Sequence, residues 1–225
     1  MRKRVSNLTL SDRAYNLIKE KIISYDEGQY LSIREMASEI GMSYTPVREA
    51  FQRIEKEGLL KRIPNVGFFV PQIDIRHIEE IFQVRECLEV FVLDKVFDLI
   101  TAEDLETLSD YVDNQVEHLR KGEIHQYVMV DKQFHMLPFR LYGNSHFIDL
   151  IENVREQHLI CSVKIARNES TEAIKEHREL IEHMGNKDKE RALSTLRTHI
   201  DNAKQRMKDG YISLRQWPAN MVRLK

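Results

Sequence analysis

Cysteine is scarce in this 225-residue chain, where only Cys87 and Cys161 occur and no CxxC pair is present. The chain therefore offers no thiolate metal site, and its cysteine content is typical of a reducing compartment. No apolar run approaches the roughly 18 residues of a membrane-spanning helix, and the basic, polar N-terminus has no signal-peptide pattern. We therefore expect a soluble, cytoplasmic protein with no membrane partner.

Net charge is small overall, at −2, but it is unevenly distributed. Residues 1–72 hold 12 basic and 9 acidic side chains, a net +3, whereas the remainder holds 22 and 27, a net −5. The excess of positive charge favours a nucleic-acid partner for the first part, although ordinary scatter of surface charges is an alternative. The length suits two modest domains or one large domain.

Residues 31–70 have the pattern of a winged helix-turn-helix. Ser32 and Glu35 form a capping-box motif that predicts the start of one helix, and Gly41 predicts its end. Ser43 or Thr45 can cap the next helix. Two short apolar runs, residues 59–63 and 68–70, flank the turn 64–67 and predict a hairpin, the wing.

The second helix of this motif predicts a buried face and an exposed face. Its apolar residues recur at helical spacing and are Val47, Ala50, Phe51 and Ile54. That spacing leaves the opposite face to Thr45, Arg48, Glu49 and Gln52. An exposed helix beside a protruding loop is a shape that fits a DNA groove, so the pattern predicts binding to double-stranded DNA.

The rest of the chain predicts helices only. Residues 9–25 form an amphipathic helix that precedes the motif, and helix starts are expected at Asp74, Thr101, Gly122, Asn144, Ser170 and Asn186. The fold class is thus mainly α, with an N-terminal winged helix-turn-helix and a C-terminal antiparallel bundle of about six helices. The expected domains are residues 1–72 and 77–210, joined by a linker at 73–76 and followed by an irregular tail at 211–225.

Asp131 and His135 lie four residues apart, so both side chains project from one face of a helix. His177 and His199 fall on later predicted helices. Three imidazoles and a carboxylate suit a divalent ion such as Zn²⁺, Ni²⁺ or Mn²⁺, with coordination positions left open. The alternative is that each histidine is simply hydrogen-bonded within the bundle.

The run LSIREMASEIGMSYTPVREAFQRIEKEGLL resembles the DNA-binding domain of the GntR family of bacterial transcription regulators. The resemblance implies that Arg34 and Arg48 hold operator phosphates or bases and that Gly67 approaches the minor groove. Tyr44 stands where many members carry arginine, and the wing tip is not basic. The DNA-binding residues that we expect are Arg34, Ser43, Tyr44, Thr45, Arg48 and Gly67.

The helical part resembles the FCD effector-binding domain of the FadR subfamily, in its shorter, VanR-like six-helix variant. The matching elements are DKQFH at 131–135, Glu176 with His177, and His199 with Ile200. The resemblance implies a metal site formed by Asp131, His135, His177 and His199. Zinc is the expected ion, and nickel and manganese are alternatives.

The same resemblance implies an effector, a small organic acid that binds at the metal. An arginine of the first bundle helix completes the anion pocket in this family, and the matching residue is Arg85. A guanidinium in an apolar bundle requires a partner, and a bidentate carboxylate fits its fork. A salt bridge from Arg85 to Glu89 or to another helix is the alternative.

These patterns together predict a ligand-responsive repressor that binds a two-fold symmetric operator as a homodimer. The same patterns are compatible with two other functions. A metal-dependent helical hydrolase fused to a winged helix would use the same ligands to activate water. A regulator whose metal is purely structural would carry the ion without sensing a ligand.

Overall fold

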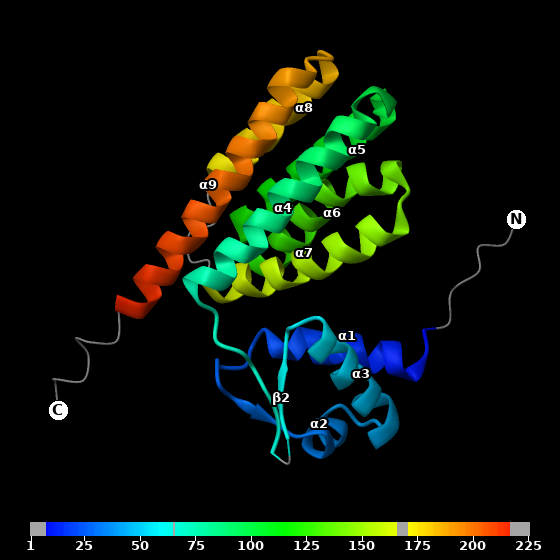
Figure 1. Cartoon of the computed structure of the whole chain (residues 1–225), viewed down its shortest axis with the longest axis vertical. Helices are drawn as coiled ribbons and strands as arrows, with labels where there is room; N and C mark the ends of the chain where they lie inside the picture. Colours follow the sequence, from blue (N-terminus) through cyan, green and yellow to red (C-terminus); the bar gives the residue numbers. More distant parts are fainter. Residues whose placement is uncertain (1–7, 65, 166–170, 217–225) are drawn as a thin grey trace, which may run out of the picture. The chain divides into compact units, whose positions relative to one another are not determined.

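The computed structural model describes residues 8–64, 66–165 and 171–216, which are mainly helical (Figure 1). Asn65 and Ser170 lie outside the described residues, as do residues 217–225 of the predicted tail. The helices are α1 Leu10–Ile22, α2 Ile33–Glu39, α3 Tyr44–Lys56, α4 Ile75–Val96, the 3₁₀ turn η1 Phe97–Leu99, α5 Ala102–Lys121, α6 Ile124–Tyr142, α7 Ser145–Ile165, α8 Thr171–Gly185 and α9 Lys189–Gln216. The strands are β1 Tyr30–Leu31, β2 Lys61–Ile63 and β3 Gly67–Phe69.

The chain forms two compact units that meet in sequence between Ile73 and Asp74. The first unit contains α1 to α3 and the three strands, and the second contains α4 to α9. Because α4 begins at Ile75, it takes up part of the segment that the sequence predicts to be a linker. Each unit is described by itself.

The first unit is built around the apolar face of α3. Val47, Ala50, Phe51 and Ile54 are completely buried, whereas Thr45, Arg48, Glu49 and Gln52 are exposed. Ala14, Ile18 and Ile22 of α1 complete this core. The predicted division of α3 into a buried and an exposed face is therefore correct.

Ser32 occupies the N-cap position of α2, but its side chain makes no capping hydrogen bond. The capping box predicted from Ser32 and Glu35 is therefore absent. Ser43 is the N-cap of α3 and likewise makes no side-chain cap. Both helices depend on burial of their apolar residues rather than on side-chain capping, because tertiary packing supplies most of the stability of helices in proteins.

The wing contains a strand that the sequence did not reveal. The sheet order is β1-β3-β2, with both pairs antiparallel, and Tyr30 and Leu31 of β1 pair with Phe69 and Phe68. Phe68 packs edge-on against Phe51, with 5.0 Å between ring centroids, and so fastens the sheet to α3. Gly67 has φ +142°, and a Cβ there would meet the Leu31 carbonyl oxygen at 3.1 Å.

The second unit is a bundle of the six helices α4 to α9 (Figure 1). In this bundle α4 lies against α6, α7 and α9, and α8 lies against α5 and α9. Three predicted caps are confirmed: the Asp74 side chain accepts from the backbone N–H of His77, Thr101 forms a capping box with Asp104, and the Asn144 side chain accepts from the backbone N–H of His146. The expected helical bundle is confirmed for the described residues.

Three helix boundaries differ from expectation. Gly122 ends α5 in the left-handed conformation, and α6 starts two residues later. The last helix begins at Lys189 rather than at Asn186. It also continues to Gln216, so the irregular tail predicted from residue 211 is wrong for residues 211–216. Gly210 lies within this helix and against Ile165, where a Cβ would approach the Ile165 Cγ2 to 2.8 Å.

In the described part of the chain, no helix has the length and apolar character needed to span a bilayer.

Replacing Phe51 with alanine should destabilise the first unit by about 3 to 5 kcal/mol, because it removes a buried ring and leaves a cavity. Hydrogen exchange of the α1 and α3 amides, followed by mass spectrometry, should then be faster by roughly 100-fold or more. The control is Gln52→Ala on the exposed face of the same helix, which should change stability by less than about 0.5 kcal/mol. Equal exchange rates in the two variants would contradict the assigned core.

Candidate functional site

Three histidines from three helices converge in the interior of the second unit. His135 lies on α6, His177 on α8 and His199 on α9, and each is at most 4% exposed. Their Nε2 atoms form a nearly equilateral triangle, with edges of 3.2 Å from His135 to His177, 3.2 Å from His135 to His199 and 3.3 Å from His177 to His199. The three residues are far apart in sequence, so only the bundle brings them together.

The opposite nitrogen of each ring is held by a fixed oxygen. His135 Nδ1 lies 2.8 Å from Glu89 Oε2, and His199 Nδ1 lies 2.8 Å from Glu176 Oε2. His177 Nδ1 lies 3.0 Å from the side-chain oxygen of Gln115. Because all three partners are acceptors, each Nδ1 carries a proton toward its partner and each Nε2 is the atom that faces the centre.

The orientation of the Gln115 amide follows from its second contact. Its Nε2 donates to Asp131 Oδ1 over 3.3 Å, and an ionised carboxylate can only accept. The Gln115 oxygen is therefore the atom that faces His177. Gln115 is completely buried, so both contacts satisfy groups that water does not reach.

Two of the three imidazoles, those of His135 and His177, are neutral at pH 7. Burial lowers the pKa of His135 to about 4, and burial followed by repulsion from His199 and His135 holds the pKa of His177 well below its usual value. Two neutral rings that both donate from Nδ1 cannot donate to each other through Nε2. Their lone pairs face each other across 3.2 Å, an arrangement that a cation between them relieves.

The size of the nitrogen triangle fits a divalent transition-metal ion. An ion about 2.1 Å from each nitrogen requires edges of about 3.4 Å in tetrahedral coordination and about 3.0 Å in octahedral coordination. The observed edges of 3.2 to 3.3 Å lie between these values. Neutral imidazole is a suitable ligand for zinc, copper, nickel or iron. By donor type, protonation and spacing, the three histidines fit such an ion.

Asp131 lies one turn before His135 on α6 and at the edge of the nitrogen triangle. Its Oδ1 is 3.8 Å from His135 Nε2 and 3.6 Å from His177 Nε2, longer than any edge between the nitrogens. Its Oδ2 accepts from Arg155 Nη1 over 3.2 Å. Burial alone would raise the pKa of Asp131, but His135 and Arg155 hold it below its ordinary value, so the carboxylate is ionised.

Glu89 on α4 joins this centre to two buried arginines. Its Oε1 accepts from Arg85 Nε over 2.9 Å, and its Oε2 accepts from Arg155 over 2.6 Å and from His135. Burial raises the pKa of Glu89, but Arg155, Arg85 and His135 outweigh that effect and hold the pKa well below its usual value. Glu89 is therefore an anion that ties α4 to α6 and α7.

Arg85 is 1% exposed, and its two terminal nitrogens have no hydrogen-bond partner. The predicted salt bridge to Glu89 is present, but it engages only Nε. Glu89 Oε1 accepts only from Arg85 Nε, and its other oxygen is shared by Arg155 and His135. Arg85 is thus half-satisfied, and its free donors are of the kind that bind a carboxylate.

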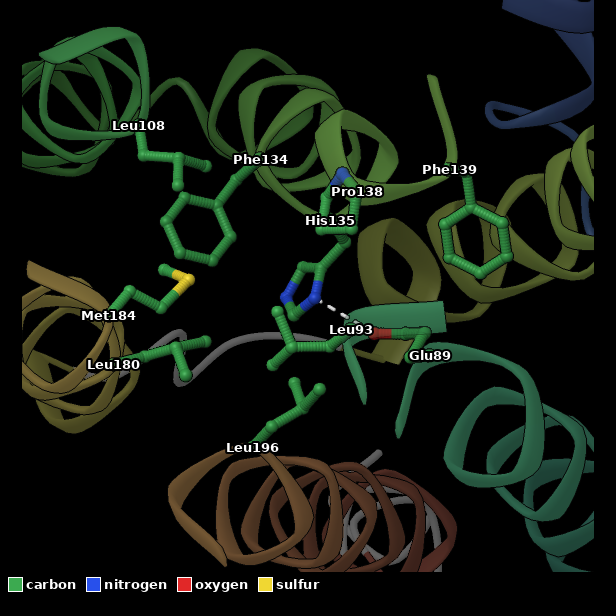
Figure 2. A pocket seen from close by; sticks show the side chains of 10 residues that line it. All are labelled: Glu89, Leu93, Leu108, Phe134, His135, Pro138, Phe139, Leu180, Met184 and Leu196. Carbon is green, nitrogen blue, oxygen red and sulfur yellow. Dashed lines mark ion pairs between the residues drawn. The ribbon is translucent and has the colours of Figure 1, made fainter. Parts of the chain in front are cut away.

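An apolar cavity borders His135 and Glu89. Figure 2 shows His135 and its ion pair with Glu89 among side chains from α4, α5, α6, α8 and α9. The cavity measures about 20 Å³ and is lined mostly by Leu, Phe and Met, so it has room for one water at most. The ring of Phe134 also stacks on His177, at 4.2 Å between centroids. These contacts keep bulk water from the histidines and fix their ring planes.

The predicted DNA-binding residues are all at the surface of the first unit except for Gly67, which is half-buried in the sheet. Arg34 lies on α2, Ser43 precedes α3, and the first turn of α3 carries Tyr44 and Thr45. These four are exposed, as is Arg48 one turn further along α3, and Tyr44 is 47% exposed. A large aromatic ring open to solvent at a helix N-terminus is available for contact with a partner.

Sequence reasoning missed three groups that shape the site. Gln115 and Arg155 have no motif that marks them, and Glu176 is identified in the sequence only as the neighbour of His177 in a family motif, without a role of its own. The structure places Glu176 between His199, Arg206 and Asn202, which overcome the effect of burial and lower its pKa to about 2. The sequence signal for Gln115 and Arg155 is a polar residue at a position where helical spacing calls for an apolar one.

Comparison with known families agrees with this architecture. Residues 80–202 match the FCD domain, and residues 10–70 match the bacterial regulatory proteins of the gntR family. The chain belongs to the GntR family of transcription regulators and carries an FCD domain. It is a regulator rather than an enzyme, so the alternative of a metal-dependent hydrolase is set aside.

Three similar proteins illustrate the relationship. The gluconate operon transcriptional repressor of Bacillus subtilis is 25% identical over 210 residues, which cover 89% of this chain and 85% of that protein. The structure of E. coli McbR/YncC has a TM-score of 0.80 at 24% identity, covering 90% of this chain and 99% of that one. The Zn²⁺-bound FCD domain of TM0439 has a TM-score of 0.55 at 26% identity and covers 63% of this chain and 99% of that one.

Replacing Glu89 with glutamine should destabilise the second unit by about 3 to 5 kcal/mol, because two buried guanidinium groups lose their shared counter-charge. Urea denaturation at pH 7 measures the loss. The control is Glu86→Gln, an exposed glutamate on the same helix, which should change stability by less than about 0.5 kcal/mol.

The effect of this substitution depends on pH. The folded pKa of Glu89 lies below 4.5, the ordinary value for a glutamate, so its contribution to stability is complete above that pH and falls as the pH drops further. The stability difference between wild type and Glu89→Gln should therefore shrink below about pH 4.5. A difference that is small at pH 7, or that grows in acid, would contradict an ionised Glu89.

Proposed function

We propose that this protein is a metabolite-controlled repressor whose effector, a small carboxylic acid, binds at a divalent metal ion in the helical unit. The observation that carries the proposal is the convergence of three Nε2 lone pairs beside a buried arginine with unpaired terminal nitrogens. The name of the Bacillus subtilis relative, a transcriptional repressor, supports repression rather than activation.

Asp131, His135, His177 and His199 hold the ion in this proposal. Zinc is favoured because the related FCD domain of TM0439 binds Zn²⁺, and nickel and manganese remain alternatives. Asp131 supplies the carboxylate ligand by a small movement of Oδ1 toward the triangle, since Oδ1 is already within 3.8 Å of two ring nitrogens. The ion polarises a bound carboxylate and leaves open positions for it.

Arg34, Ser43, Tyr44, Thr45, Arg48 and Gly67 form the proposed DNA-reading surface. Arg48 lies on the exposed face of α3, and a guanidinium can contact guanine or phosphate there. Tyr44 replaces a cation at the start of α3 and offers an aromatic ring and a hydroxyl instead. The operator bases that this position reads therefore differ from those read by an arginine.

A homodimer on a two-fold symmetric operator gives the effector a way to control occupancy. Each protomer places one α3 in the major groove, and the spacing of the half-sites follows the dimer. The acid can favour one arrangement of the dimer only if it binds that arrangement more tightly than the other. The expected difference in binding free energy is about 1 to 3 kcal/mol. A purely structural metal would show no such coupling.

Replacing Arg48 with alanine should weaken operator binding by about 10- to 100-fold, the effect expected from losing one bidentate contact. A gel-shift titration with the natural upstream region measures the change, and metal content should stay the same. Lys56→Ala is the control, because it removes the same charge from the exposed last turn of α3. An Arg48 variant that binds as well as the Lys56 variant would contradict the assigned reading helix.

Replacing His135 or His177 with alanine should strip the metal, because two ring nitrogens remain where three converge. Elemental analysis of the purified full chain gives the metal content per protomer. His146→Ala, on the exposed surface of α7, should keep the wild-type content. Full metal content in both His135 and His177 variants would refute the site.

A further inference from the structure

Gln115 is a polar residue on the buried face of α5, which otherwise carries Leu108 and Val112. Its amide is completely buried, so its donor and its acceptor both require partners inside the protein. The oxygen accepts from His177 of α8, and the NH₂ group donates to Asp131 of α6. Gln115 therefore connects two of the proposed metal ligands, which lie on different helices.

The three histidines differ in the group that holds the outer nitrogen. His135 and His199 face Glu89 and Glu176, which are ionised carboxylates and can only accept a hydrogen bond. His177 faces a neutral amide, which has an oxygen at one end and an NH₂ group at the other. The proton of His177 is therefore fixed only if this amide cannot turn round.

Asp131 prevents the Gln115 amide from turning. Its carboxylate is ionised, and Oδ1 lies 3.3 Å from Gln115 Nε2. A reversed amide would lose this hydrogen bond and place its oxygen against the carboxylate, which is unfavourable in a buried site of low dielectric. The charge of Asp131 thus keeps the Gln115 oxygen on His177 Nδ1, at 3.0 Å.

The orientation of Gln115 decides which nitrogen of His177 carries the proton. Burial holds the pKa of His177 well below its usual value, so the ring is neutral and carries one proton, at Nδ1 or at Nε2. A proton at Nε2 would leave the Nδ1 lone pair against the amide oxygen. The same proton would point into the nitrogen triangle, where His135 Nε2 lies 3.2 Å away, and would occupy the place of an ion.

We propose that Gln115 is a positioning residue: oriented by the charge of Asp131, it holds His177 in the tautomer whose Nε2 is free to bind an ion. The consequence for the ion rests on the proposed function, whereas the tautomer is a property of the protein without metal. Asp131 and His177 are then not independent ligands, because the charge of one prepares the ring of the other.

Nitrogen NMR of the full chain, labelled with ¹⁵N-histidine and stripped of metal with a chelator, measures the tautomer directly. In wild type, His177 should be protonated at Nδ1, with its signals assigned from a His177→Gln variant. Gln115→Met keeps the length of the side chain but removes the amide donor and acceptor, so His177 should become protonated at Nε2. Gln115→Glu keeps an oxygen toward Nδ1 and should retain the wild-type tautomer.

Zinc affinity, measured by competition with a chelator, should fall about 10- to 100-fold in Gln115→Met, the usual effect of losing a group that orients a ligand. Two controls separate positioning from packing. Val112→Ala removes buried atoms one turn earlier on the same face, and Asn114→Ala removes an exposed amide from the same helix. Both should keep the wild-type tautomer and zinc affinity.

Several outcomes would overturn the role of Gln115. His177 protonated at Nε2 in wild type, or still protonated at Nδ1 in Gln115→Met, is one. Equal zinc affinity in wild type and Gln115→Met is another, and a change of tautomer in Val112→Ala would show that packing alone controls the ring. Wild type that binds no zinc would refute the proposed function instead, and the tautomers of the zinc-free variants would still decide the role of Gln115.

Discussion

Three imidazole nitrogens lie within 3.3 Å of one another inside the helical unit, and their protons are all committed elsewhere. Glu89, Glu176 and Gln115 each accept from the far side of one ring. The rings therefore cannot satisfy one another, and burial keeps them away from water. A cation is the simplest species that satisfies all three lone pairs at once, and the packing of α6, α8 and α9 is arranged around that requirement.

Glu89 connects the three histidines to other helices of the bundle. It contacts His135 on α6, Arg155 on α7 and Arg85 on its own helix α4. Charges that share one buried carboxylate respond together when any of them gains a new partner, because the local dielectric is low. A ligand that engaged Arg85 would therefore act on the same group that orients the His135 ring.

The sequence predicts the helical bundle, the winged helix-turn-helix and the convergent histidines, because helical periodicity and a family motif are both patterns that can be read directly from the order of residues. Other features depend on contacts that no local pattern encodes. Gln115 and Arg155 reach Asp131 from helices α5 and α7, and a two-residue strand such as β1 exists only through its partner β3. An irregular tail is expected from residue 211, but Gly210 lies inside α9, where its missing Cβ allows close contact with Ile165. The side chains of Glu176 and His177 point in different directions, because they are adjacent on one helix. Since α8 packs against both α5 and α9, His177 contacts Gln115 of α5 and Glu176 contacts His199 of α9.

In the proposed site, His135, His177 and His199 are ligands of a single ion together with Asp131. X-ray absorption spectroscopy of the metal-loaded full chain tests it directly, because imidazole rings give a characteristic outer-shell scattering. The expected result is one ion per chain with about three imidazole nitrogens at about 2.0 to 2.1 Å and oxygen in the remaining positions. A first shell with sulfur, or with fewer than two imidazoles, would contradict the account.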